Sequence, residues 1–136
     1  MFSAADHGFM SEALALATRQ LGKVAPNPAV GCIIVKDGSV VGSGVTARGG
    51  RPHAETEALA KAGAQATGAT AYVTLEPCAH HGKTPPCATA LAAAGIKRVV
   101  VACSDPDPRV NGQGLSYLRD QGVIVETGLL DSKAQD

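Results

Sequence analysis

The sequence predicts an α/β protein whose layered sheet starts antiparallel and continues parallel. Two β-branched runs, 30–35 and 40–45, are joined by Lys36-Asp37-Gly38, which is typical of a hairpin turn. Further along, short apolar runs alternate with helical stretches, and strands separated by helices usually pair in parallel. The later strands are expected at 71–75, 99–103 and 123–125, and the helices between them at 53–61, 87–94 and 115–121. The complete mixed sheet would have about five strands.

The chain opens with a predicted helix from Ser3 to about Gly22. Its apolar stripe has the spacing of one helix face and comprises Met10, Ala13, Leu14, Ala17 and Leu21. Pro26-Asn27-Pro28 then forces a turn, because two prolines fix φ and remove N–H donors. The chain has 136 residues and shows no internal repeat or linker, so residues 1–136 are expected to form a single domain.

Composition narrows the class of function. The apolar fraction is 45% and the aromatic fraction only 3%, so the core must be built from Ala, Val, Leu and Ile. Basic and acidic residues number 12 each with no basic run, which argues against a nucleic-acid partner and favours a small-molecule substrate. No secretory leader and no apolar run of about 20 residues is present, so we expect a cytoplasmic protein that contacts no membrane.

Two separated motifs predict a zinc site. The first is His53-Ala54-Glu55, and the second comprises Pro77-Cys78 and, further along, Cys87. One imidazole and two thiolates form a tetrahedral zinc set with one position left for a reactant. Zinc in such a site lowers the pKa of a bound water from 15.7 to about 7, and the resulting nucleophile can attack an electron-poor ring carbon. Glu55, beside the metal but not bound to it, is placed to relay the protons.

The local sequence around these ligands supports the assignment. Thr84-Pro85-Pro86-Cys87 reads as a helix cap, a proline in the first turn and then the cysteine, and the positive helix end favours the thiolate of Cys87. Pro52 likewise precedes His53 at an expected helix start. On a regular helix, residues two apart point away from each other, so His53 and Glu55 can share a site only at an irregular first turn.

The combined pattern resembles the zinc-dependent nucleobase and nucleoside deaminases, whose signature is His-x-Glu followed by Pro-Cys-x-x-Cys. Here eight residues separate Cys78 from Cys87 instead of two. That expanded segment, 77–87, resembles the riboflavin-biosynthesis pyrimidine deaminase family, often the N-terminal half of a bifunctional deaminase-reductase. Residues 26–31 and Asp105-Pro106-Asp107-Pro108 resemble further motifs of that family. The resemblance runs from about residue 7 to 130.

The resemblance implies a three-layer α/β/α fold of the cytidine-deaminase type, a Zn²⁺ cofactor and a dimer or larger homo-oligomer. The implied reaction is hydrolytic deamination of 2,5-diamino-6-ribosylamino-4(3H)-pyrimidinone 5′-phosphate. By matching positions, Asn27 would hydrogen-bond the ring or ribose, and Asp105 would lie near the pocket rim. His80 and Lys83 would lie at the substrate, with Lys83 meeting the phosphate as a point charge in place of the more common arginine. The resemblance assigns no role to His81 or Asn111.

Other interpretations stay open from the sequence. The zinc could be structural, with Cys32 or Cys103 as a fourth ligand, although both cysteines sit in apolar strands and read as core. The chain could deaminate cytosine, guanine or a tRNA adenosine, or it could be a zinc-stabilised binding module without activity. No reductase half follows residue 136, so the expectation is either a stand-alone deaminase or one domain of a longer protein.

Overall fold

A computed structural model describes residues 4–19, 31–45, 54–75, 87–103 and 113–127. The helices are α1 (Ala4–Arg19), α2 (Ala54–Ala62), α3 (Cys87–Ala93) and α4 (Gln113–Asp120), with a short 3-10 helix η2 (Gly63–Ala66). The strands are β1 (Gly31–Lys36), β2 (Ser39–Val45), β3 (Thr70–Leu75), β4 (Arg98–Cys103) and β5 (Ile124–Thr127). The predicted elements are therefore confirmed in kind and order, and η2 is an element that the sequence pattern did not predict.

The five strands form one mixed sheet in the order β2-β1-β3-β4-β5. β1 is antiparallel to both β2 and β3, whereas β3, β4 and β5 are mutually parallel neighbours. The predicted change from antiparallel to parallel pairing is confirmed. The hairpin turn is formed by Asp37 and Gly38, whose φ values of 52° and 80° match the left-handed conformations of a two-residue type I′ turn.

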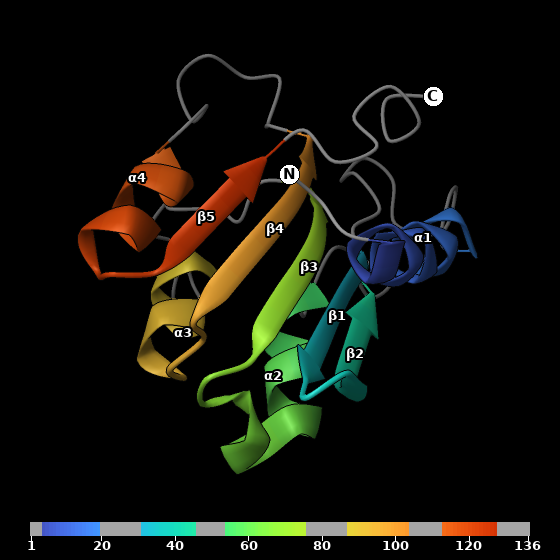
Figure 1. The fold of residues 1–136 in the computed structure, drawn as a ribbon, viewed down its shortest axis with the longest axis horizontal. Helices are drawn as coiled ribbons and strands as arrows, with labels where there is room; N and C mark the ends of the chain where they lie inside the picture. Colours follow the sequence, from blue (N-terminus) through green and yellow to red (C-terminus); the bar gives the residue numbers. More distant parts are fainter. Residues whose placement is uncertain (1–3, 20–30, 46–53, 76–86, 104–112, 128–136) are drawn as a thin grey trace.

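Helices cover both faces of the sheet, which gives the three layers expected (Figure 1). On one face α1 packs through Met10 and Ala13 against a cluster that includes Ile33, Tyr72 and Val100. The other face is covered by α2, α3 and α4, and its larger cluster contains Ala58, Leu91 and Leu118 from the helices together with strand residues Cys32, Ile34, Val73, Val99 and Val101. Within the described part of the chain, Tyr72 is thus the one aromatic residue of the buried core, which otherwise consists of aliphatic side chains with Met10 and Cys32.

Two glycines let helices approach the sheet closely. A Cβ added at Gly31 would overlap the backbone carbonyl oxygen of Ala13 on α1, and one added at Gly42 would overlap that of Ala58 on α2. Any larger residue at these positions would push a helix off the sheet. Small residues therefore set the spacing of the layers at β1 and β2.

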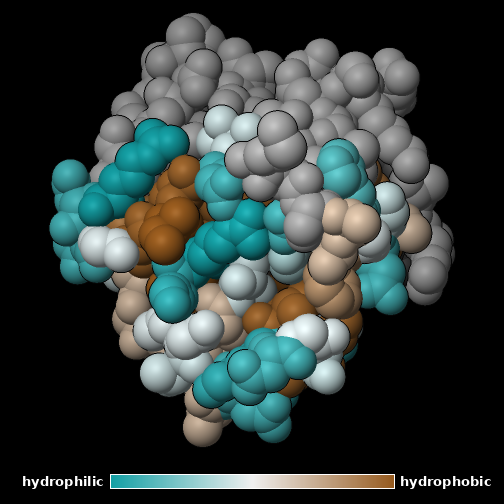
Figure 2. Space-filling view, viewed as in Figure 1, coloured by the Kyte–Doolittle hydropathy of each residue, from teal (hydrophilic) through white to brown (hydrophobic). Residues whose placement is uncertain are grey.

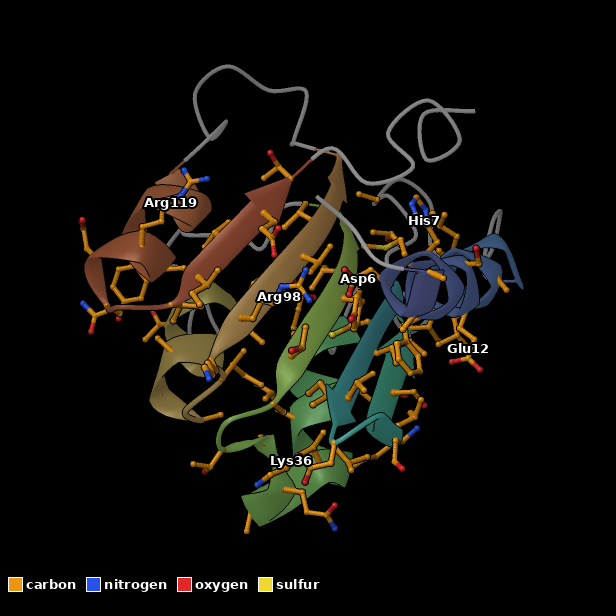
Figure 3. The ribbon with its side chains drawn as sticks, viewed as in Figure 1. Asp6, His7, Glu12, Lys36, Arg98 and Arg119 are labelled. Carbon is orange, nitrogen blue, oxygen red and sulfur yellow. The ribbon has the colours of Figure 1, made fainter. Side chains whose placement is uncertain are left out.

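A buried ionic network fastens α1 to the sheet. Arg98 on β4 donates two hydrogen bonds of 3.0 Å to the two carboxylate oxygens of Asp6, and the Tyr72 hydroxyl donates a third of 2.6 Å. Arg98 also pairs with Glu126 on β5. Figure 3 shows Asp6 and Arg98 pointing toward one another from α1 and β4. Because the carboxylate of Asp6 is 5% exposed, this pairing offsets the cost of its burial.

Beyond α1, the face over β4 and β5 is mixed in character, with hydrophilic side chains lying between apolar ones (Figure 2). Arg98 and Glu126 supply charge there, and Ile124 is exposed. No helix among the described residues is long and apolar enough to cross a membrane.

Candidate active site

One edge of the sheet collects the segments that lead to the predicted site. The parallel strands β3 and β4 both end there, with Leu75 opposite Cys103, and β1 begins there at Gly31 because it runs opposite to β3 (Figure 1). β2 also ends at this edge, where Val45 pairs with Gly31. In sheets with parallel strands, ligands bind beyond the carboxyl ends of the strands. We call this the catalytic edge.

Two of the predicted site residues, Glu55 and Cys87, belong to described helices. The remaining six lie outside the described residues: Asn27, His53, Cys78, His80, Lys83 and Asp105. The described chain next to each of them nevertheless reaches the catalytic edge. Asn27 precedes the start of β1, Cys78 follows the end of β3, and Asp105 follows the end of β4. The positions of these six side chains stay predictions.

Glu55 is the second residue of α2 and is only 4% exposed. The helix starts at this edge, since Glu55 is near enough for its charge to act on Cys32, the second residue of β1, whereas Ala58 lies further down against Gly42. A carboxylate is rarely buried to this extent unless it is partnered or functional. α2 is described from Ala54 onward and His53 lies outside the described residues, so the expectation that His53 and Glu55 share a site at an irregular first turn stays a prediction.

Cys87 is the first described residue of α3, and the predicted cap and prolines before it, Thr84 to Pro86, lie outside the described residues. α3 packs against α2 and against α4, so the beginnings of α2 and α3 belong to one helical layer. The sequence therefore delivers a carboxylate and a thiol to the first turns of two neighbouring helices. This arrangement suits chemistry in which one group carries protons and the other binds a metal.

Cys32 has a different character. It is fully buried in the cluster between the sheet and α2, and the pKa of its thiol is raised well above the usual value, first by burial and then by the negative charge of Glu55. Its side chain is enclosed by apolar residues, as is usual for a buried cysteine that acts as a small hydrophobic residue. This supports the interpretation of Cys32 as a core residue that lines the side of the site nearest Glu55.

Two polar contacts near the sheet were not anticipated from sequence. The first is the pairing of Asp6 with Arg98, and the second is a hydrogen bond of 3.0 Å in which the Gly31 N–H donates to the side-chain oxygen of Thr74. A hydroxyl residue between Val73 and Leu75 in an apolar strand was the available signal for the second contact. Thr74 lies at the end of β3, directly on the catalytic edge.

The donor set fits zinc by its chemistry. One imidazole from His53 and two thiols from Cys78 and Cys87 are the ligand types that zinc prefers, and a set of three leaves room for a reactant. Among the described residues alone no group of three His, Cys, Asp or Glu side chains comes together, so a zinc site at this edge would draw on residues outside the described ranges, where both His53 and Cys78 lie. A purely structural zinc site needs no carboxylate beside it, so the buried Glu55 at the same edge favours a catalytic site.

Comparison with known families and proteins agrees with this arrangement. Residues 3–103 match the family model described as the cytidine and deoxycytidylate deaminase zinc-binding region. The chain is 55% identical over 130 residues to the riboflavin biosynthesis protein RibD of Escherichia coli, covering 96% of this chain and 35% of that protein. It is 49% identical over 130 residues to the diaminohydroxyphosphoribosylamino-pyrimidine deaminase of Buchnera aphidicola, covering 96% of this chain and 88% of that protein.

Solved structures give the same result for the fold. RibD of Acinetobacter baumannii superposes with a TM-score of 0.93 at 54% identity, covering 96% of this chain and 36% of that one. The dCMP deaminase of cyanophage S-TIM5, solved with dCMP and dUMP, superposes with a TM-score of 0.70 at 26% identity, covering 93% of this chain and 98% of that one. The chain thus spans about a third of the RibD relatives, 88% of the Buchnera deaminase and 98% of the cyanophage deaminase.

The fold, the zinc-binding motif and these matches place the chain in the family of zinc-dependent cytidine and deoxycytidylate deaminases, which are hydrolytic enzymes. Within that family its similarity is strongest to the deaminases of riboflavin biosynthesis, at about 50% identity. The expanded spacing between Cys78 and Cys87, which first indicated this branch, is consistent with that result.

Proposed function

We propose that this chain hydrolyses the ring amino group of 2,5-diamino-6-ribosylamino-4(3H)-pyrimidinone 5′-phosphate, releasing ammonia and the pyrimidinedione. The observation that carries the proposal is the 49% identity to a diaminohydroxyphosphoribosylamino-pyrimidine deaminase of which this chain covers 88%. The buried carboxylate of Glu55 and the thiol of Cys87, each in the first turn of a helix at the catalytic edge, support the same reaction.

The zinc site in this proposal consists of His53, Cys78 and Cys87. Zinc held by these residues would supply an activated water at neutral pH. All three ligands come from segments that flank described elements at the catalytic edge, namely the start of α2, the end of β3 and the start of α3. Cys32 is left out of this ligand set because its side chain is fully buried in the core cluster between the sheet and α2.

Glu55 does the acid–base work. Its carboxylate takes a proton from the attacking water and gives a proton to the departing amino group, so that one residue serves both half-steps and ammonia leaves as a neutral molecule. Burial at 4% exposure keeps bulk water from competing for these protons. The position of Glu55 on a helix, rather than in a loop, fixes the direction of the carboxylate.

Substrate contacts follow the family pattern. Asn27 hydrogen-bonds the ring or ribose, His80 lies at the substrate, and Lys83 neutralises the phosphate. Asp105 lies at the pocket rim. We further propose that the active form is a homo-oligomer and that the partner is this small phosphorylated pyrimidine, without nucleic acid or membrane.

The test is ammonia release by the purified chain with its zinc content measured. The pathway pyrimidine is offered in parallel with dCMP, cytidine, cytosine and guanine, and Glu55→Gln serves as the inactive control. We expect release from the pathway compound, at a kcat/KM far above that for the other bases.

Ammonia release from dCMP alone would refute the proposed substrate but not the proposed type of reaction. The similarity to the cyanophage dCMP deaminase makes dCMP the alternative substrate to test. Release from none of the five, by protein that carries one equivalent of zinc, would indicate a non-catalytic zinc module and overturn the proposal.

A further inference from the structure

We propose that Thr74 is a positioning residue, whose hydroxyl anchors the start of β1 to the end of β3 and so fixes the segment carrying Asn27 relative to the segment carrying Cys78. The inference rests on the proposed function, because it assigns a task within the same site. Thr74 itself touches neither metal nor substrate in this proposal. It acts through the backbone of Gly31.

The hydrogen bond between Gly31 and Thr74 lies directly beyond the last backbone pairing of β1 with β3. The antiparallel pairing of β1 with β3 runs from Val35 opposite Thr70 to Cys32 opposite Val73. Continuing the register would place Gly31 opposite Thr74, and here the Gly31 N–H donates to the Thr74 side-chain oxygen at 3.0 Å. The bond is buried, and Thr74 is 5% exposed. A side-chain acceptor therefore holds Gly31, the first residue of β1, at the catalytic edge.

Because Gly31 has no side chain, only contacts of its backbone can fix its position. It is buried, and it lies so close to α1 that a Cβ would overlap the carbonyl oxygen of Ala13. The residue is thus pressed between α1 on one side and the hydroxyl of Thr74 on β3. A buried N–H that loses its acceptor is costly, so removing the hydroxyl would favour a shift of this backbone toward another acceptor or water.

The chain transmits such a shift directly to the site. Asn27 stands four residues before Gly31, and Cys78 stands four residues after Thr74. Four residues reach at most about 14 Å, so the two anchored points constrain where both segments can go. A displacement of about 1 Å in a group that orients substrate can cost roughly a hundredfold in rate. Among the described contacts, the hydrogen bond between Gly31 and Thr74 is therefore the one best placed to set the distance between the proposed substrate-binding segment with Asn27 and the proposed metal-binding segment with Cys78.

The experiment compares Thr74→Val, Thr74→Cys and Thr74→Ser with the unmodified 136-residue chain. Valine keeps the shape and the β-branch but has no acceptor, cysteine has a weak one, and serine has a good one. For Thr74→Val we expect one equivalent of zinc, an increased KM and a kcat/KM that falls roughly ten- to a hundredfold. KM should be intermediate for Thr74→Cys and close to that of the parent for Thr74→Ser.

Thr70→Val is the matched control. Thr70 lies on the same face of β3, four residues away at the opposite end of the strand, and it also loses a hydroxyl in this exchange. Its KM should equal that of the parent. Melting temperatures of all variants separate a positioning role from a purely structural one. Partial unfolding lowers the apparent kcat, because it reduces the active fraction, and it leaves KM unchanged.

The proposal is overturned if Thr74→Val keeps the parental KM, if Thr74→Ser does not restore it, or if Thr70→Val raises it equally. The graded series decides the question from Thr74→Cys and Thr74→Ser even if Thr74→Val does not fold. If the parent deaminates dCMP instead of the pathway compound, the proposed substrate fails and the same KM comparison is made with dCMP. If the parent deaminates none of the compounds, both the proposed function and the proposed role of Thr74 are wrong.

Discussion

Glu55 is held almost out of solvent in the first turn of α2, near the thiol of Cys32. A neutral amide of the same size can fill this space but cannot take up and release a proton. We predict that Glu55→Gln folds and keeps its zinc, while kcat falls by a factor of about 100 to 10,000, the range for removal of a general acid–base group. Ammonia release and metal analysis on the same sample test this.

The control for this prediction lies on the same helix. Glu57→Gln alters a carboxylate that is paired with Lys61 on the solvent side of α2. Such an exposed pair contributes little to stability, so this variant should keep the parental rate. A normal rate for Glu55→Gln, or an equal loss in both variants, would remove Glu55 from the chemistry.

Cys87 and Cys32 should respond differently to substitution. Cys87 starts α3 at the catalytic edge, whereas Cys32 is enclosed by the core. We predict that Cys87→Ser loses bound zinc and that Cys32→Ala retains one equivalent, with only a moderate loss of stability from the smaller side chain. One full equivalent of zinc in purified Cys87→Ser would refute its assignment as a ligand.

At the scale of elements, α1 is joined to the sheet by Asp6, Tyr72 and Arg98. Burial, then the hydrogen bond and charge of Asp6, raise the pKa of Tyr72 to about 12. Since the folded pKa lies above the ordinary value of about 10, the neutral phenol stabilises the fold fully below pH 10, and this contribution is lost as the pH rises from about 10 to 12. Burial by itself would favour the same neutral form.

We therefore predict that Tyr72→Phe lowers the free energy of unfolding by about 1 to 3 kcal/mol near neutral pH, because a hydrogen bond to a buried carboxylate is lost. The difference between parent and variant should shrink between pH 10 and 12. Urea unfolding of both proteins at several pH values measures it. A difference that stays constant up to pH 12 would contradict the assigned role of the Tyr72 hydroxyl.

The elements were predictable from sequence where the signal is local. The Asp37-Gly38 turn, the β-branched strands and the alanine-rich helix from Cys87 each depend on a few neighbouring residues. The pairing of Asp6 with Arg98 was not predictable, because the partners are 92 residues apart and meet only after the sheet has formed. The hydrogen bond from Gly31 to Thr74 is hidden for the same reason, with 43 residues between its partners.

The candidate site shows the same division. His-x-Glu and the two cysteines are short motifs, so the sequence indicated the zinc chemistry and the enzyme class that the comparisons bear out. The sequence could not show that Glu55 is buried near Cys32, because that depends on how closely α2 approaches β1 and β2. Gly42 makes the approach possible, and the role of a glycine in such a contact appears only in three dimensions.

For the whole molecule, the proposed zinc site joins the start of α2, the end of β3 and the start of α3, which belong to both the helical layer and the sheet. The core beneath it is built largely from small aliphatic side chains, including Ala58, Ala62 and Ala71, so a metal that ties these elements together should add noticeably to stability. A ligand present at a hundred times its Kd stabilises the folded state by about 2.7 kcal/mol.

We predict that removing zinc with a chelator abolishes ammonia release and lowers the Tm by roughly 10 °C, and that added zinc restores both. The variants make the test specific. Glu55→Gln keeps all three proposed ligands and should show the parental zinc-dependent rise in Tm despite its lost activity, whereas Cys87→Ser should show little or none. Scanning calorimetry of the three proteins with and without zinc gives the answer. If zinc raised the Tm of Cys87→Ser as much as that of the parent, Cys87 would not be a zinc ligand. If zinc did not raise the Tm of Glu55→Gln, Glu55 would be a zinc ligand and not the residue that carries the protons.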